Sequence, residues 1–217
     1  MNAKIYVQRI VVMDEEPARV VVRPERGALA SAPPTTPPTS PPYHPDRLTG
    51  LALGAMEILL RDVRMDERAR MGVVMGTVAG CLEVDREFDR SRRENARYAS
   101  PAAFSRTLPS TVLAELALYI KLTGPSVALS NGDATFAFAV WRAARWVEAF
   151  DLPCCAAVYA DHLGRGLRNP YTGEAIAAAE GSCFVQMWLL SRKTGGEELR
   201  LGEVSLTRFA GGTHAIG

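Results

Sequence analysis

The sequence has few histidines and cysteines and no excess of charge of either sign. Its 217 residues include three histidines and four cysteines, and no two cysteines have the C-x-x-C spacing of a zinc or redox motif. Twenty-five Lys and Arg residues oppose 24 Asp and Glu, so a net charge of +1 provides no electrostatic attraction to nucleic acid. We therefore expect no metal site, no cofactor and no nucleic-acid partner.

Long apolar runs are also missing. No window approaches the roughly 18 apolar residues of a membrane span, and charged residues interrupt the first thirty positions, where a signal peptide would lie. Four cysteines without a disulfide pattern fit a reducing compartment, so we expect a cytoplasmic protein. Hydrophobic residues make up 47%, which predicts one domain with its own core over positions 1–217.

Prolines are concentrated in one segment. Positions 31–46 (SAPPTTPPTSPPYHPD) hold seven of the fourteen prolines. Because proline fixes φ and has no backbone N–H, neither a helix nor a central strand fits this segment. We expect an extended loop, which serves either as a solvated connector or as a ligand for a proline-recognising domain.

Hydrophobic periodicity elsewhere predicts an alternation of strands and helices. The expected strands cover 5–13, 20–22, 71–78, 126–130, 154–160, 180–192 and 199–209. The expected helices cover 46–63, 83–97, 110–122 and 134–150. The unbroken apolar run 71–78 is typical of a strand that is buried on both faces. This order predicts a layered α/β domain.

Several motifs follow one another in a recognisable order. MGVVMGTVAG (71–80) precedes ASPAAF (99–104), and a helix then ends at Gly124-Pro125 before a short strand, a long apolar helix and a further strand. EGSCFVQMWLLSR (180–192) closes the series. This order resembles the N-terminal half of the β-ketoacyl synthases. The resemblance implies a thiolase-like half, in which a layered mixed sheet carries helices on both faces.

The resemblance fails at the catalytic residues. Counting from Gly124-Pro125 places Asp133 where the family has its nucleophilic cysteine. The family also uses histidines, or a histidine and an asparagine, and a lysine from a C-terminal half that this chain lacks, and His214 matches none of these motifs. A carboxylate would have to form a mixed anhydride from a thioester, an uphill exchange, whereas Asp133 suits the N-cap of the next helix. We expect no catalytic residue and no condensation by this chain alone.

The helix at 134–150 has an apolar surface too wide for packing on one side only. In the family the corresponding helix lies between the sheets of the two halves. We expect a partner subunit or a second copy to cover it, or else the Pro-rich segment and the C-terminal tail. Because the strand before this helix pairs across the family's dimer axis, the interface candidates are Ser126, Leu129, Asn131, Phe136 and Trp141.

The resemblance implies a non-condensing subunit of the chain-length-factor type. Such a subunit pairs with an active ketosynthase, or with itself, in bacterial polyketide, fatty-acid or aryl polyene biosynthesis. One alternative is a small acyl-thioester hydrolase or transferase that uses Asp133 or a cysteine. Another is a non-catalytic protein that binds an acyl carrier protein through Arg90, Arg92, Arg93 and Arg97.

Two pairs of adjacent residues, Asp161-His162 and Cys154-Cys155, are also candidates for a site. Asp161-His162 has the chemistry of an acid/base pair, but in the family its position corresponds to a loop after a buried strand, so we expect His162 on the surface. Cys154-Cys155 lie in an apolar strand and are expected to be inert core residues.

Overall fold

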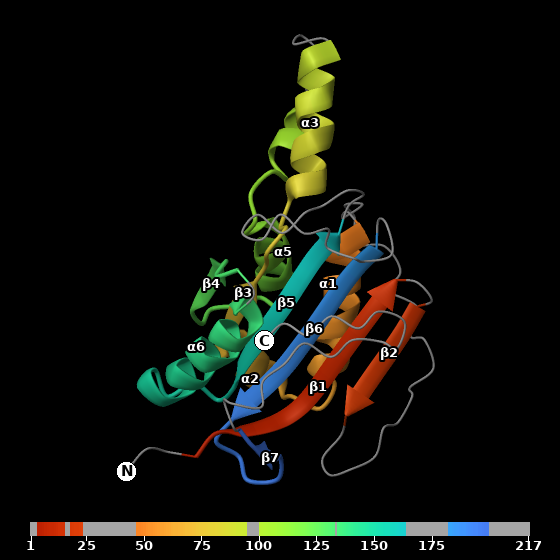
Figure 1. Ribbon diagram of the computed structural model, residues 1–217. Helices are drawn as coiled ribbons and strands as arrows, with labels where there is room; N and C mark the ends of the chain where they lie inside the picture. The colour runs from red at the N-terminus through yellow and green to blue at the C-terminus, as the bar shows by residue number, and fades with distance from the viewer. Residues whose placement is uncertain are drawn as a thin grey trace.

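A computed structural model gives the fold (Figure 1). The structure describes residues 4–15, 18–23, 47–94, 100–132, 134–163 and 182–199. The Pro-rich segment, Asp133, Arg97 and His214 lie outside these ranges. Within them, no helix is long and apolar enough to cross a lipid bilayer.

The centre of the molecule is a mixed β-sheet. Its strands are β1 (Tyr6–Glu15), β2 (Ala18–Arg23), β3 (Gly72–Gly76), β4 (Ser126–Leu129), β5 (Cys155–Leu163), β6 (Ser182–Ser191) and β7 (Glu197–Glu198). They are ordered β2-β1-β6-β5-β3-β4, and β7 pairs with β1. The pairs β3–β4 and β3–β5 are parallel, whereas the other pairs are antiparallel.

Helices cover both faces of this sheet. They are α1 (Arg47–Leu59), α2 (Met65–Arg70), α3 (Leu82–Glu94), α4 (Pro101–Phe104), α5 (Thr111–Tyr119) and α6 (Thr135–Ala149). In Figure 1, α1 and α5 lie behind the sheet and α6 lies in front of β3 and β5. The predicted layered mixed sheet with helices on both faces is confirmed.

Alternation along the strands divides the core into two clusters. Ala156, Val158 and Ala160 of β5 point toward α1 and α5, whereas Cys155 and Ala157 point toward α6. All five residues of β3 are buried, as the unbroken apolar run predicts. The apolar composition of β3 and of residues 155–158 of β5 therefore follows from helices packed on both faces.

Several element boundaries differ from the prediction. The strand expected to end at position 160 continues to Leu163, so Asp161 and His162 lie in β5, and the expected loop there is wrong. Pairing with β6 extends this strand, an interaction that the apolar run of β5 does not reveal. The short helices α2 and α4 were not predicted. Of the strand expected at 199–209 only Leu199 is described, and it lies after β7.

The two connections that follow β3 run on opposite faces of the sheet. The connection from β3 to β4 runs through α5 on one face, and the connection from β4 to β5 runs through α6 on the other. The carboxyl ends of β3, β4 and β5 therefore share one edge of the sheet. This edge is a topological switch point, the place where α/β proteins most often build their sites.

Candidate functional site

The carboxyl ends of β3 and β4 meet the start of α6 at a close contact. A Cβ atom at Gly76 would lie 2.6 Å from the Thr135 Cγ2 and 3.2 Å from the Thr135 carbonyl oxygen. Glycine at this position therefore lets the first turn of α6 pack directly on the end of β3.

The turn between β4 and α6 is held by Thr135, which is fully buried. Its Oγ1 accepts the backbone N–H of Asn131 at 2.7 Å and donates to the carbonyl oxygen of Gly132 at 2.6 Å. Ala134 occupies the N-cap position of α6, and Asp133, where we expected the N-cap, lies outside the described residues. Thr135 satisfies the polar groups of this turn from inside the helix, a role that sequence reasoning missed.

Asp161 on β5 holds the loop that follows β3. Its fully buried carboxylate accepts the N–H groups of Val78 at 3.1 Å, Ala79 at 3.0 Å and Gly80 at 3.0 Å, as well as the hydroxyl of Thr77. A buried carboxylate is tolerated only where donors replace its lost hydration, and this loop supplies four. Within the described residues, the carboxylate therefore binds the loop that follows β3.

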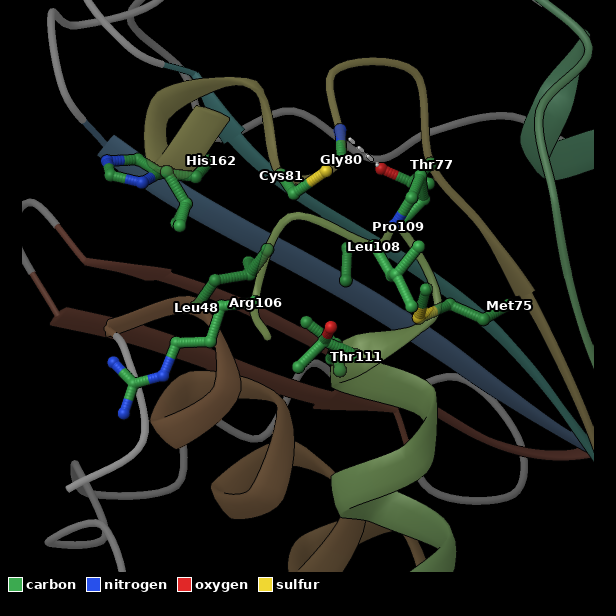
Figure 2. A pocket seen from close by; sticks show the side chains of 13 residues that line it. Leu48, Met75, Thr77, Gly80, Cys81, Arg106, Leu108, Pro109, Thr111 and His162 are labelled. Carbon is green, nitrogen blue, oxygen red and sulfur yellow. Dashed lines mark hydrogen bonds between the residues drawn. The ribbon is translucent and has the colours of Figure 1, made fainter. Parts of the chain in front are cut away.

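Beside this loop lies a small cavity, shown in Figure 2. Its lining includes Thr77, Cys81, Arg106, Leu108 and His162, and its volume is about 20 Å³. His162 and Arg106 lie at the same side of the cavity in this view, away from Met75. The volume is enough for about one water molecule and far too small for an acyl chain. Sequence reasoning missed Thr77 and Arg106 as neighbours of Asp161-His162.

Three of the cysteines have a pKa well above the usual range of a thiol. Burial and the neighbouring carboxylate of Asp85 raise the pKa of Cys81 to about 11, and its Sγ also lies 2.6 Å from the Thr107 carbonyl oxygen. Burial raises the pKa of Cys154 to about 12 and that of Cys155 well above its ordinary value. These thiols are protonated near neutral pH and are poor nucleophiles. The expectation that Cys154 and Cys155 are inert core residues agrees with this burial.

The five interface candidates differ in how far the chain itself covers them. Ser126 and Asn131 are exposed, and Leu129 is half-buried. Trp141 is 37% exposed and stacks on Phe138, the two ring centroids lying 5.3 Å apart.

Phe136 is the exception among these candidates, with an exposure of only 2%. Its ring packs edge-to-face on Tyr159 and Trp188, with centroid distances of 6.3 and 5.6 Å. Its side chain therefore belongs to the core of this chain and is not available to a partner. The assignment of the other four to an interface stays a prediction.

The arginines of α3 are exposed but partly neutralised. Asp89 forms ion pairs with Arg92 at 2.9 Å and with Arg93 at 2.7 Å. The hydrogen bond from Arg92 and the charges of both guanidinium groups lower the pKa of Asp89. Arg90 is also exposed. Acidic residues interleaved with the arginines in this way reduce the electrostatic attraction between α3 and an acidic carrier protein.

No family model matches this sequence, and no curated protein matches it either. Solved structures do match the fold. The chain is similar to the ishigamide ketosynthase/chain length factor, with 19% identity over 90% of this chain and 64% of that one, at a TM-score of 0.64. It is also similar to a ketosynthase in complex with its chain length factor from Xenorhabdus doucetiae, with 19% identity over 75% of this chain and 66% of that one, at a TM-score of 0.57.

A β-ketoacyl synthase from Burkholderia phymatum STM815 matches as well, with 15% identity over 87% of this chain and 59% of that one, at a TM-score of 0.59. The chain therefore has the thiolase-like fold of the ketosynthases, as the order of its motifs predicted. Its neighbours in fold are ketosynthases and ketosynthase–chain length factor assemblies. The chain spans less than two thirds of the length of each of these structures.

Proposed function

We propose that this chain is a non-condensing subunit of the chain-length-factor type. It pairs with a ketosynthase or with a second copy of itself. The pathway is bacterial biosynthesis of acyl chains, of the polyketide, fatty-acid or aryl polyene kind. The chain's place of action is the cytoplasm, which suits four free thiols. The observation that carries this proposal is the edge of β4, which pairs with no second strand among the described residues, in a fold whose solved examples include ketosynthase–chain length factor complexes.

Strand β4 ends the described sheet, and its only strand partner there is β3. Natural proteins usually protect such an edge with charged residues or a covering element. Residues 126–130 (SVALS) carry no charge. Since a two-fold axis would place identical residues close together, an uncharged strand can pair with its own equivalent without repulsion.

Exposed apolar side chains lie at both ends of α5, which packs beside β4. Leu108, which is 62% exposed, precedes α5 at the carboxyl edge of the sheet. Leu118 and Tyr119, which are 74% and 45% exposed, lie at the other end of α5, near the amino edge. A partner of the same fold, paired antiparallel along β4, brings its own equivalent of Leu118 toward Leu108 of this chain.

The exposed apolar area is large enough for such an interface. Phe104 is 61% exposed and adds to the three side chains at the ends of α5. At about 200 Å² for each large side chain, the four expose roughly 500 Å². A standard interface buries about 800 Å² per partner, so these residues and the edge of β4 supply most of that area.

The non-condensing part of the proposal is supported by what the described residues offer chemically. The described thiols with resolved pKa shifts are protonated near neutral pH, Asp161 is occupied by four donors, and the cavity beside it is too small for an acyl chain. Asp133 holds the position of the family's nucleophile, and a carboxylate does not accept an acyl group from a thioester without an uphill exchange.

The test is the solution mass by light scattering, for the chain alone and after co-expression with the ketosynthase encoded nearest to it. A one-to-one complex or a homodimer is expected. Leu118→Glu should weaken the affinity of this complex or homodimer at least tenfold, because the substitution places a charge in the apolar contact. Arg61→Glu is the control, since this exposed residue follows α1, which packs mainly on β6 and β1 of the sheet.

Two results would contradict the proposal. One is a chain that stays monomeric and ignores the ketosynthase. The other is a thioesterase rate that Asp133→Asn abolishes, which would favour a small hydrolase instead.

A further inference from the structure

We infer that Asp161 is a positioning residue, whose buried carboxylate fixes the orientation of the α3–α4 arm relative to the sheet. The α3–α4 arm is defined here as α3 (Leu82–Glu94) and α4 (Pro101–Phe104). Asp161 would act in this way whichever partner the chain binds, so this role stands apart from the proposed function.

The carboxylate and the loop form a compact anion nest. Backbone N–H groups at three consecutive positions, Val78, Ala79 and Gly80, converge on one side chain that lies more than 80 positions later in the sequence. Successive N–H groups that point into one concavity are a recurrent way to bind an anion. Here the protein supplies the anion itself, from the neighbouring strand β5.

Hydrogen bonds within the loop also join Gly80 to Thr77. The N–H of Gly80 also donates to the Thr77 Oγ1 at 2.8 Å, and the Thr77 hydroxyl donates to Asp161. Gly80 has a φ of +55°, a left-handed conformation that glycine adopts without strain. The loop therefore has one well-defined shape only while the carboxylate is present to organise its donors.

The same loop begins the arm. The N–H of Leu82 donates to the Ala79 carbonyl oxygen at 3.0 Å, and the N–H of Asp85 donates to the Cys81 carbonyl oxygen at 2.9 Å. Ala79 is thus bound to Asp161 through its N–H and to the first turn of α3 through its carbonyl. Two hydrogen bonds connect the sheet to the helix through one residue.

Other contacts at the base of the arm are the Cys81 Sγ, which lies 3.4 Å from the Asp85 Oδ2 and 2.6 Å from the Thr107 carbonyl oxygen, and the Val84 side chain in the lining of the cavity. Figure 1 shows α3 projecting beyond the edge of the sheet at which β5 ends. Among the described elements, α3 packs mainly on α4 and β5. The ring of Phe88 packs on Phe104 of α4 within the arm, with a centroid distance of 5.5 Å. A solvent-exposed helix of 13 residues is marginal alone, so its order depends on what holds its base.

Hydrogen exchange of backbone amides, read by mass spectrometry, tests this role in the full chain. Asp161→Ala should increase exchange over residues 77–94 roughly tenfold or more, while the core strand β6 and helix α1 change far less. Asp161→Asn should have a smaller effect, because its amide oxygen can still accept some of the donors. The control is Asp62→Ala, which removes an exposed carboxylate that pairs with Arg9.

Thr77 provides a second test if Asp161→Ala does not fold. Thr77→Val keeps the shape of the side chain but removes the hydroxyl, so it should loosen the same segment, and Thr77→Ser should restore protection. Unchanged protection over 77–94 in Thr77→Val and in either Asp161 variant would overturn the assignment. Equal loss over β6 and α1 would also overturn it, because the carboxylate would then stabilise the whole fold and not the arm.

Discussion

Phe136 and Phe138 lie two positions apart on α6, yet the structure gives them opposite environments. Phe136 is 2% exposed, whereas Phe138 is 40% exposed. Phe136→Ala and Phe138→Ala are therefore a matched pair: the same atoms are removed from the same helix. We expect the first to lower the free energy of unfolding strongly and the second to lower it little.

The magnitude follows from the packing of Phe136. Truncating a buried phenylalanine to alanine typically costs about 3–5 kcal/mol, because apolar area is lost and a cavity remains. Phe136 also loses its edge-to-face contacts with Tyr159 and Trp188. We expect about 4 kcal/mol for Phe136→Ala, a large part of the roughly 5–15 kcal/mol that stabilises a domain of this kind. Phe138→Ala loses a partly exposed ring and should cost about 0.5–1 kcal/mol.

The assay is urea unfolding followed by tryptophan fluorescence. Trp188 lies beside Phe136, so its emission reports directly on this part of the core. Phe136→Leu is a further control, since it keeps most of the volume and should cost less than about 1.5 kcal/mol. Equal losses for Phe136→Ala and Phe138→Ala would refute the placement of α6 on the sheet, and Phe136 would again be a candidate for the subunit interface.

Two further predictions concern backbone packing and pH. Gly124→Ala should lower the free energy of unfolding by about 3 kcal/mol, because a Cβ atom there would lie 2.0 Å from the Met71 carbonyl oxygen. Gly50→Ala in α1 should raise it by about 0.5–1 kcal/mol in the same urea titration, because a Cβ atom there meets nothing within 4 Å. Folding raises the pKa of Cys81 to about 11 and that of Cys154 to about 12, from an ordinary 9.0. Above pH 9 the folded state therefore keeps protons that the unfolded state releases. The free energy of unfolding should fall as the pH rises above 9. Replacing both residues by serine should flatten that decline, and a pH profile identical to that of the original chain would contradict it.

Much of the fold could be predicted because its signals are local. The apolar run 71–78 and the strand at 154–160 indicate strands buried on both faces, and the structure places helices on both sides of them. The motif order around Gly124-Pro125 resembles that of the β-ketoacyl synthases, and this resemblance implied the thiolase-like fold, which the similarity to solved structures confirms. Periodicity and turn residues act over a few positions, so they can be read without tertiary information.

The site could be predicted only in part. Asp161 and His162 stand out as a polar pair after an apolar strand, but nothing in the sequence indicates that the donors of the loop at 77–80 lie around Asp161. The parallel pairing of β3 with β5 brings these segments together. Such pairing joins distant parts of the chain, and the backbone N–H groups that bind the carboxylate have no signature in the side chains.

The sequence by itself determined the α/β class, the buried strands and a net charge too small to attract nucleic acid, because composition and periodicity follow directly from the residues. The resemblance to the ketosynthases rests on the order of the motifs along the chain. Only the tertiary structure decided which aromatic ring of α6 is core and which is surface, and that β4 lies at a free edge of the described sheet. It also decided that Asp161 holds the base of the α3–α4 arm. These properties depend on which segments of the chain become neighbours, and burial, edges and hydrogen-bond partners are defined only once those neighbours are in place.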